Sequence, residues 1–306
     1  MTSDQVVDRR TFLKVAGAVA AGGAVAAGIA AFVVAQPGEA DALVAKHHDG
    51  PLPEDPLDGD WTGLDHYVVP LILQQVTQPQ AKELAVPSLR VRAMHNGERL
   101  AFHIEWEDAT RDDIDAVARF RDAVAVQLPT VEEADAAAPA TSITMGLPGA
   151  GTTPGQKVHI LQWKASWQAD IDRGRQTVQD AFPNMYIDVK PETLMSAEDA
   201  IVFYPGIFAG NAMSARQRTT PIEERVAAGF GSLTTLDEQE ATGKGVHSNG
   251  RWHVIIERSM AAGDNRLALA PGGAVPVAFA VWSGSKQNRG ARKQYATWVP
   301  MQIEEA

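Results

Sequence analysis

The sequence predicts a mainly β protein, an antiparallel β-sandwich with a few short helices. From residue 61 to the end of the chain, short apolar, β-branched and aromatic runs alternate with Gly, Pro and Asn-Gly turn signals. In several runs every second residue is apolar, which is the period of a strand with one buried face. No repeat of 20–50 residues is visible, so a solenoid or a propeller is not expected.

The composition of the chain allows a substantial core and excludes several kinds of site. Its 306 residues are 45% hydrophobic and carry a formal net charge of -11. That size suits one large domain or two small ones, and the acidic balance disfavours a nucleic-acid partner. The chain has no cysteine, so it forms no disulfide, holds no iron–sulfur cluster and attaches no haem covalently.

The first 35 residues have the pattern of a twin-arginine export signal. Arg9 and Arg10 precede an uncharged, Ala- and Gly-rich run from Val15 to Ala35. The run is long enough to span a bilayer, so a membrane anchor is the alternative if the signal is not cleaved. We expect export to the periplasm or another extracytoplasmic space.

Residues 36–60 are rich in Pro, Asp and Gly, and we expect them to be a linker. The domain then covers residues 61–306. Its clearest element is a hairpin of two strands, 88–95 and 99–106, joined by a type I′ turn at Asn96-Gly97. Met94 lies on the face of this hairpin that carries the arginines. There it is expected to cover the sheet, although its sulfur is also a possible iron ligand.

Further elements follow from the same signals. Strands are expected at 67–76, 123–128, 158–163, 186–189, 201–204, 252–258, 275–282 and 295–303, a helix at 170–182 and a helical turn at 221–228. Residues 129–156 form a connection that is long for a compact domain, and such loops are commonly functional or disordered.

The stretch 144–170 combines a Gly- and Pro-rich loop with a strand that ends on a lysine. The loop carries Met145 and the strand ends at Lys164. On the strand, Gln162 and Lys164 share one face, and Trp163 lies on the other. A thioether in a loop and an amine at the end of a buried strand are both possible iron ligands. Most methionines, however, fill cores, and most lysines that end strands are solvated.

Residues 160–167, Ile-Leu-Gln-Trp-Lys-Ala-Ser-Trp, resemble the tryptophan-lysine motif of the ethylbenzene dehydrogenase haem-binding family. Other segments resemble the family in the same order: 89–106, 122–129, 182–188, 203–214, 229–234, 243–258 and 278–298. The resemblance covers nearly everything after about residue 60. It implies a haem b (gamma) subunit of periplasmic molybdenum enzymes related to dimethyl sulfoxide reductase.

The resemblance further implies a non-catalytic electron-transfer subunit, with the haem held by loops at one end of the sandwich. Its partners would be a molybdopterin catalytic subunit and an iron–sulfur subunit, and it would exchange electrons with a soluble cytochrome or similar carrier. In this family a methionine and a lysine are the axial ligands of the haem iron. Met145 matches the methionine, and Lys244 and Lys164 are the two candidate lysines.

The lysine ligand must be a free amine, so its site must be shielded from water. A buried strand end such as that of Lys164, or the glycine-bracketed segment around Lys244, meets this requirement. Lys164 could instead pair with a haem propionate, and His247 is the next candidate ligand if these fail.

The competing hypothesis is a non-haem β-sandwich that binds a solute or a carbohydrate. The sequence contains no nucleotide-binding loop, no serine-hydrolase elbow and no zinc-protease motif, and its His residues lack metal-ligand spacing. An absorbance spectrum separates the two hypotheses, because only a haem protein has a Soret band.

Overall fold

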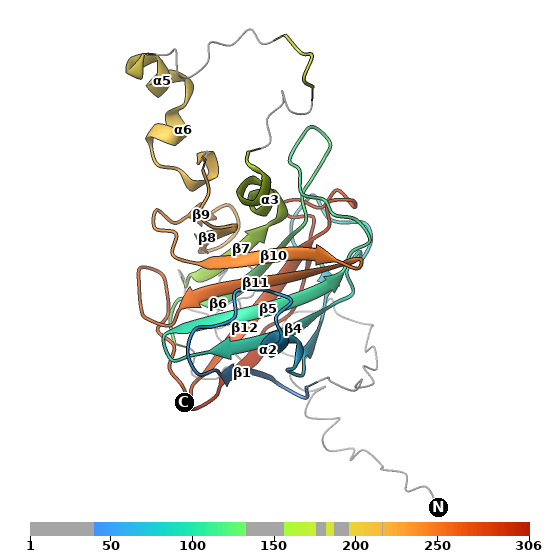
Figure 1. The fold of residues 1–306 in the computed structure, drawn as a ribbon, viewed down its shortest axis with the longest axis vertical. Helices are drawn as coiled ribbons and strands as arrows, with labels where there is room; N and C mark the ends of the chain where they lie inside the picture. Colours follow the sequence, from blue (N-terminus) through green and yellow to red (C-terminus); the bar gives the residue numbers. More distant parts are fainter. Residues whose placement is uncertain (1–39, 133–155, 176–181, 187–195, 216) are drawn as a thin grey trace, which may run out of the picture.

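The computed structural model describes residues 40–132, 156–175, 182–186, 196–215 and 217–306, which form two β layers with short helices at their margins (Figure 1). The predicted mainly β, mostly antiparallel fold is confirmed. Among these residues, no helix has the length and apolar character needed to cross a membrane. Met145 and the expected export signal lie outside the described residues.

The first layer is built around the predicted hairpin. Its strands, in spatial order, are β10 (Thr242–Ser248), β11 (Arg251–Ser259), β5 (Arg99–Glu107), β4 (Ser88–His95), β1 (Leu43–His47) and β14 (Val299–Ile303), and β2 (Tyr67–Pro70) pairs with β4. All neighbours are antiparallel except β1, which runs parallel to both β4 and β14.

Strand β1 corrects the prediction that residues 36–60 are a linker. Leu43 and Ala45 are buried and pair with residues of β14, so this segment closes the middle of the first layer. Helix α2 (Gly59–Thr62) lies in the same region and buries Trp61 against the outer face of the layer. The strand is short and stands among Pro and Asp residues, which concealed its alternating pattern.

The second layer continues from the first through β12 (Ala274–Trp282). The first half of β12 pairs with β14, and its second half pairs with β6 (Ala123–Pro129). The strands β7 (Val158–Lys164), β8 (Ile222–Ala227) and β9 (Thr234–Thr235) follow in order. β13 (Gln294–Tyr295) pairs with β12, and β3 (Ile72–Leu73) pairs with β13.

The inner faces of the two layers enclose the core. Trp163 of β7 meets Trp252 of β11 with ring centroids 4.8 Å apart and Trp106 of β5 at 6.3 Å. The period of β7 therefore directs Trp163 inward and its neighbours Gln162 and Lys164 to the outer face of the second layer, as the sequence predicted.

The helices differ from the sequence predictions. α3 (Ala165–Arg173) begins directly after Lys164, earlier than the predicted 170–182. α5 (Ala197–Phe203) replaces the strand predicted at 201–204. Ser196 Oγ accepts a hydrogen bond of 3.1 Å from Asp199 N, and acidic residues fill the first turn of α5, both of which favour a helix N-terminus.

Two other assignments are wrong. Residues 221–228, predicted as a helical turn, contain strand β8. Its Glu223 and Glu224 are buried and form ion pairs with Lys164 and Arg266, which the sequence does not reveal. The predicted type I′ turn is also absent. Gly97 has a φ of 85° but Asn96 has no positive φ, because the Asn96 side chain accepts hydrogen bonds from the amides of Glu98 and Arg99.

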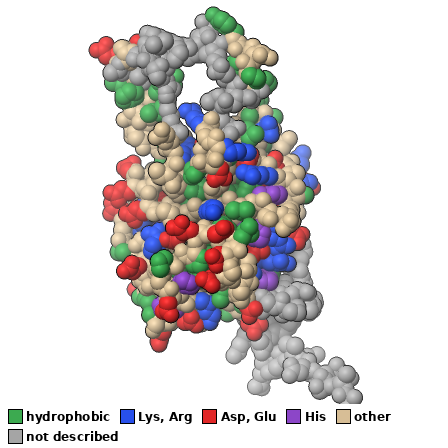
Figure 2. Space-filling model, viewed as in Figure 1, with side chains coloured by type: hydrophobic (Ala, Val, Ile, Leu, Met, Phe, Trp, Pro, Cys, Tyr) green, Lys and Arg blue, Asp and Glu red, His purple; other side chains and the backbone are tan. Residues whose placement is uncertain are grey.

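Helix α5 and helix α6 (Pro205–Phe208) project beyond the end of the β layers, followed by a 3-10 turn (Ala212–Ser214). Hydrophobic side chains gather on this projection (Figure 2). Val202, Phe203 and Phe208 are each more than half exposed. Contiguous exposed apolar side chains of this kind commonly mark a surface that contacts another protein.

Candidate functional site

A cavity of about 840 Å³ opens on the outer face of the second layer. Its floor consists of small side chains on β6 and β12, among them Ala123, Ala125 and Ala280, with Trp282 and Tyr295 beside them. Because alanines occupy neighbouring positions on adjacent strands, the space above them stays open. The volume is within the range of pockets that bind cofactor-sized ligands.

The margin of this cavity is positively charged although the whole chain is acidic. Its lining includes one carboxylate, Asp115, and the cationic side chains Arg119, Arg121, Arg225, Arg289 and Lys293. Arg121 pairs with Asp115, and Arg225 pairs with the buried Glu223. An apolar floor with surplus cations at the margin suits a ligand with an apolar body and acidic substituents.

Lys164 lies beside this cavity on the same outer face. It is fully buried, and its cross-strand neighbour Ala123 lines the cavity. Its Nζ forms an ion pair with Glu223, lies 3.3 Å from the sulfur of Met213 and lies 3.9 Å from the ring centroid of Trp167. The amine is thus enclosed by a carboxylate, a thioether and an indole.

The surroundings of Lys164 favour its neutral form. Burial, reinforced by the positive charge of Arg225, lowers the pKa of Lys164 to about 6, although Glu223 acts in the opposite direction. Because the amine loses its proton near neutral pH, it is available as a metal ligand.

The other lysine candidate is in a different environment. Lys244 is exposed on β10, in a strand rather than the expected loop, and pairs with Ile255 on the outer face of the first layer. The reserve candidate His247, on the same strand, uses its Nε2 to donate to the Asp108 carbonyl at 2.9 Å. Neither residue lines the cavity.

Of the methionines, Met94 is buried in a small apolar cluster with Trp61, Ala101 and Ile255, on the outer face of the first layer. It serves there as packing. The sulfur that the structure brings to Lys164 belongs to Met213, which the sequence analysis did not single out. Met213 is separated from Lys164 by 49 residues, and no local pattern signals the contact.

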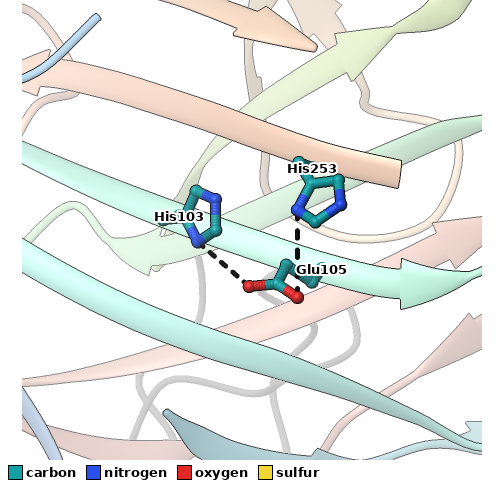
Figure 3. A group of neighbouring side chains, drawn as sticks. All are labelled: His103, Glu105 and His253. Atoms are coloured by element: carbon teal, nitrogen blue, oxygen red, sulfur yellow. Dashed lines mark ion pairs between the residues drawn. The ribbon is translucent and has the colours of Figure 1, made fainter. Parts of the chain in front are cut away.

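A second group of polar side chains lies on the outer face of the first layer (Figure 3). His103 and Glu105 of β5 and His253 of β11 lie close enough together to suggest a metal site. However, both ring nitrogens of His103 are engaged: Nε2 donates to the Pro56 carbonyl at 2.8 Å, and Nδ1 faces Arg92 Nη1 at 3.4 Å. Arg92 also pairs with Glu105, so a cation already contacts two of the three side chains.

Burial lowers the pKa of His103 to about 4, which keeps the ring neutral at physiological pH. The indole ring of Trp61 stacks on it with centroids 5.4 Å apart. We therefore interpret this group as a hydrogen-bonded support of the first layer, and the cavity of the second layer as the candidate functional site.

Comparison with known proteins agrees with the sequence motifs. The sequence model of the family described as ethylbenzene dehydrogenase matches residues 58–294. The chain belongs to the ethylbenzene dehydrogenase family. The matched region includes strands β6, β7, β8, β9 and β12 of the second layer and the alanines of the cavity floor.

Two curated relatives of this ethylbenzene dehydrogenase family chain are named as subunits of larger enzymes. A protein of Haloferax mediterranei, named as a heme subunit of a respiratory nitrate reductase, is 24% identical over 80% of this chain and 67% of its own length. The gamma subunit of dimethylsulfide dehydrogenase from Rhodovulum sulfidophilum is 24% identical over 81% of this chain and 74% of its own length.

Among solved structures, two carbohydrate-binding proteins resemble the chain distantly. A family 9 carbohydrate-binding module from Caldicellulosiruptor kristjanssonii, bound to glucose, has a TM-score of 0.39 at 9% identity and covers 87% of this chain and 96% of its own. A protein from Bacteroides uniformis named as carbohydrate-binding has a TM-score of 0.42 at 9% identity, covering 86% and 99%. At these TM-scores neither likeness bears on function.

Proposed function

We propose that this chain is a haem b-binding electron-transfer subunit of a molybdopterin oxidoreductase complex. The observation that carries the proposal is the fully buried amine of Lys164 beside a large apolar cavity with a cationic margin. The names of the two relatives, a heme subunit and a gamma subunit, support it. Because the family resemblance implies a non-catalytic subunit, we assign the chain no catalytic step.

The residues of the cavity fit both the porphyrin ring of a haem and its propionates. The alanine floor, with Trp282 and Tyr295, would provide apolar contacts for a porphyrin ring, and the cations at the margin would provide partners for propionates. Haem iron, when bound, supplies a one-electron redox couple. The protein's contribution is to bind the ring, exclude water from it and supply axial ligands.

We assign the nitrogen ligand to Lys164 rather than Lys244. Lys164 is buried and readily deprotonated, whereas Lys244 is exposed and lies on the outer face of the other layer. For the sulfur ligand, the family resemblance favours Met145, and the contact with Lys164 makes Met213 the alternative. The haem site is then on a sheet face with loops at its margin, rather than held by loops alone.

The family also supports a proposal about the partners and the location. We infer assembly with a molybdopterin subunit and an iron–sulfur subunit outside the cytoplasm, and electron exchange with a soluble cytochrome or similar carrier. Purification through a tag on this chain should recover molybdenum and an iron–sulfur subunit. A haem-loaded monomer that turns over a substrate by itself would contradict this assignment.

Absorbance spectra of the purified protein test the haem assignment directly. The wild type is expected to show a Soret band and, when reduced, a sharp α-band of low-spin haem b. Lys164→Gln should become high-spin or lose the haem, because water takes an open iron position. Lys244→Gln, a matched change on an exposed lysine, should keep the wild-type spectrum. A wild-type protein without a Soret band would instead support a non-haem binding module.

A further inference from the structure

Lys293 lies in the cavity without an acidic partner. It lines the cavity, and among the described residues no carboxylate lies within 4.0 Å of its Nζ. Its amine is 5.4 Å from the ring centroid of Trp282, which belongs to the cavity floor. By contrast, the neighbouring cations Arg121 and Arg225 both have carboxylate partners.

The backbone around Lys293 is held in place. Its carbonyl accepts a hydrogen bond of 3.1 Å from Gln74 N. The next residue, Gln294, is fully buried, accepts from Val86 N at 3.2 Å and donates to Asn288 Oδ1 at 2.6 Å. The lysine side chain therefore extends over the cavity floor from a fixed point.

Lys293 and Lys164 lie at opposite ends of one row across the sheet. Lys164 is opposite Ala123, and Ala123 is opposite Trp282. Gln294 is opposite Val281, which places Lys293 beside Trp282 at the adjacent position. Adjacent strands lie about 4.8 Å apart, so the two lysine backbones are separated by roughly 14 Å. Trp282 and Ala123 lie between the two lysines in this row.

The two lysines differ in whether a carboxylate of the protein pairs with the amine. Lys164 already has the carboxylate of Glu223. For Lys293, burial and then the positive charge of Arg225 lower the pKa to about 8, and no acidic group acts in the opposite direction. A partly buried cation without a counter-ion is costly to hold, and a ligand carboxylate placed beside it would remove that cost.

We propose that Lys293 binds a carboxylate of the ligand that occupies this cavity. The inference rests on the proposed haem function, in which that carboxylate is a haem propionate. Lys293 would then be a positioning residue that holds the ligand in the cavity from the end of the row opposite Lys164. A lysine offers up to three donors to a carboxylate as a compact charge.

The rate of haem loss tests this role separately from iron ligation. The haem-loaded protein, with any subunits that co-purify, is mixed with excess apomyoglobin, and transfer of the haem is followed by absorbance. Lys293→Gln should keep the low-spin spectrum but lose haem about tenfold faster or more, as expected for one charge-assisted hydrogen bond. Lys293→Arg should restore slow loss. Lys286→Gln, which removes an exposed lysine paired with Glu83, is the matched control and should match the wild type.

Reconstitution with iron protoporphyrin IX dimethyl ester identifies the carboxylate. Since the ester has no propionate charge, the wild type and Lys293→Gln should lose it at the same rate. An equal difference with both haems, or no difference with either, would overturn the role of Lys293. A high-spin Lys293→Gln spectrum would overturn it in favour of iron ligation. A wild-type protein that takes up neither haem would overturn the proposed function as well.

Discussion

The Lys164 amine is buried, yet it lies beside the cavity of about 840 Å³ on the outer face of the second layer. Its ion pair with Glu223 costs little to break when the amine is neutral, because Glu223 retains Arg225 and the hydroxyl of Thr235, which donates at 2.6 Å. The carboxylate therefore remains satisfied if Lys164 turns toward a metal. Burial raises the pKa of the Glu223 carboxyl, but Arg225 and Lys164 together lower it by more, to about 2.

The pH dependence of the haem spectrum follows from this amine. The pKa of Lys164 is lowered to about 6, so the free amine predominates above that pH and the ammonium form below it. Binding to iron shifts the equilibrium further toward the free amine. The low-spin spectrum is therefore expected at neutral and alkaline pH and should disappear at or below about pH 6 in a titration.

The control for this titration is Lys164→Gln, which should lack the acid transition. A low-spin form that appears only near the pKa of an ordinary lysine, about 10.4, would show that the ligand amine is solvated. That result would exclude Lys164, since its amine is enclosed by protein.

The sulfur ligand is resolved by two substitutions. The family resemblance favours Met145, whereas the 3.3 Å contact between Met213 Sδ and Lys164 Nζ makes Met213 the alternative. If Met145 is the ligand, Met145→Ala is expected to give a high-spin spectrum, and Met213→Ala a low-spin one.

The reverse pattern in these spectra would assign the sulfur to Met213. Low-spin spectra in both variants would remove methionine from the iron and leave Lys164 with a different partner. Unfolding curves should accompany the spectra, because Met213 is on a partly exposed turn and its truncation is expected to change stability little.

The residues of the site were predictable only where the signal is local. The strand period placed Lys164 on the outer face of β7, opposite Trp163, and this placement is confirmed. Its contacts with Glu223 and Met213, and the cavity that Lys293 lines, depend on residues 49 to 129 positions away in the chain. The spacing of residues within one segment cannot predict contacts between segments that are far apart in the chain.

At the scale of elements, β10 shows how closely the two layers approach. A Cβ on Gly245 would lie 2.2 Å from Trp163 Cζ2, and the Gly245 amide donates to Gln168 Oε1 at 2.8 Å. Glycine at this position lets β10 lie directly on the indole, which in turn contacts Trp252 and Trp106 in the core.

Gly245→Ala is expected to destabilise the protein by about 1–3 kcal/mol, because the added methyl group overpacks a rigid core. The adjacent substitution Lys244→Ala removes an exposed side chain from the same strand and should stay within about 0.5 kcal/mol of the wild type. Urea unfolding of both variants, followed by tryptophan fluorescence, measures the difference. Equal midpoints for the two variants would contradict the close packing of β10 on Trp163.

The elements predicted correctly are those with a strong period of their own. The strands β4, β5, β6, β7, β11 and β12 each alternate or form a long apolar run between turn signals. Strand β1 was missed because its pairing partners, β4 and β14, come later in the chain. Strand β8 was missed because buried Glu223 and Glu224 look solvated until their cationic partners are known.

At the scale of the whole molecule, charge is distributed unevenly. The chain has a net charge of -11, yet the cavity margin carries more cations than carboxylates. Among the described residues, some of these cations have no carboxylate partner, which suits the cavity to a ligand with acid groups. The apolar projection of α5 and α6 is a second local departure from the charged surface, and it is the kind of surface that subunit assembly covers.

The N-terminal segment of the sequence predicts that the chain is exported from the cytoplasm. Arg9 and Arg10 precede the uncharged run from Val15 to Ala35, a pattern typical of the twin-arginine route, which carries folded proteins. A chain that binds haem and assembles with other subunits, as we propose for this one, has reason to use that route. Arg9→Lys combined with Arg10→Lys is expected to leave the precursor in the cytoplasm, because this pair is the recognition element. Fractionation and immunoblotting measure the distribution, with Lys14→Arg as the charge-conserving control that should still be exported. Normal periplasmic accumulation of the double variant would show that the chain leaves the cytoplasm by another route.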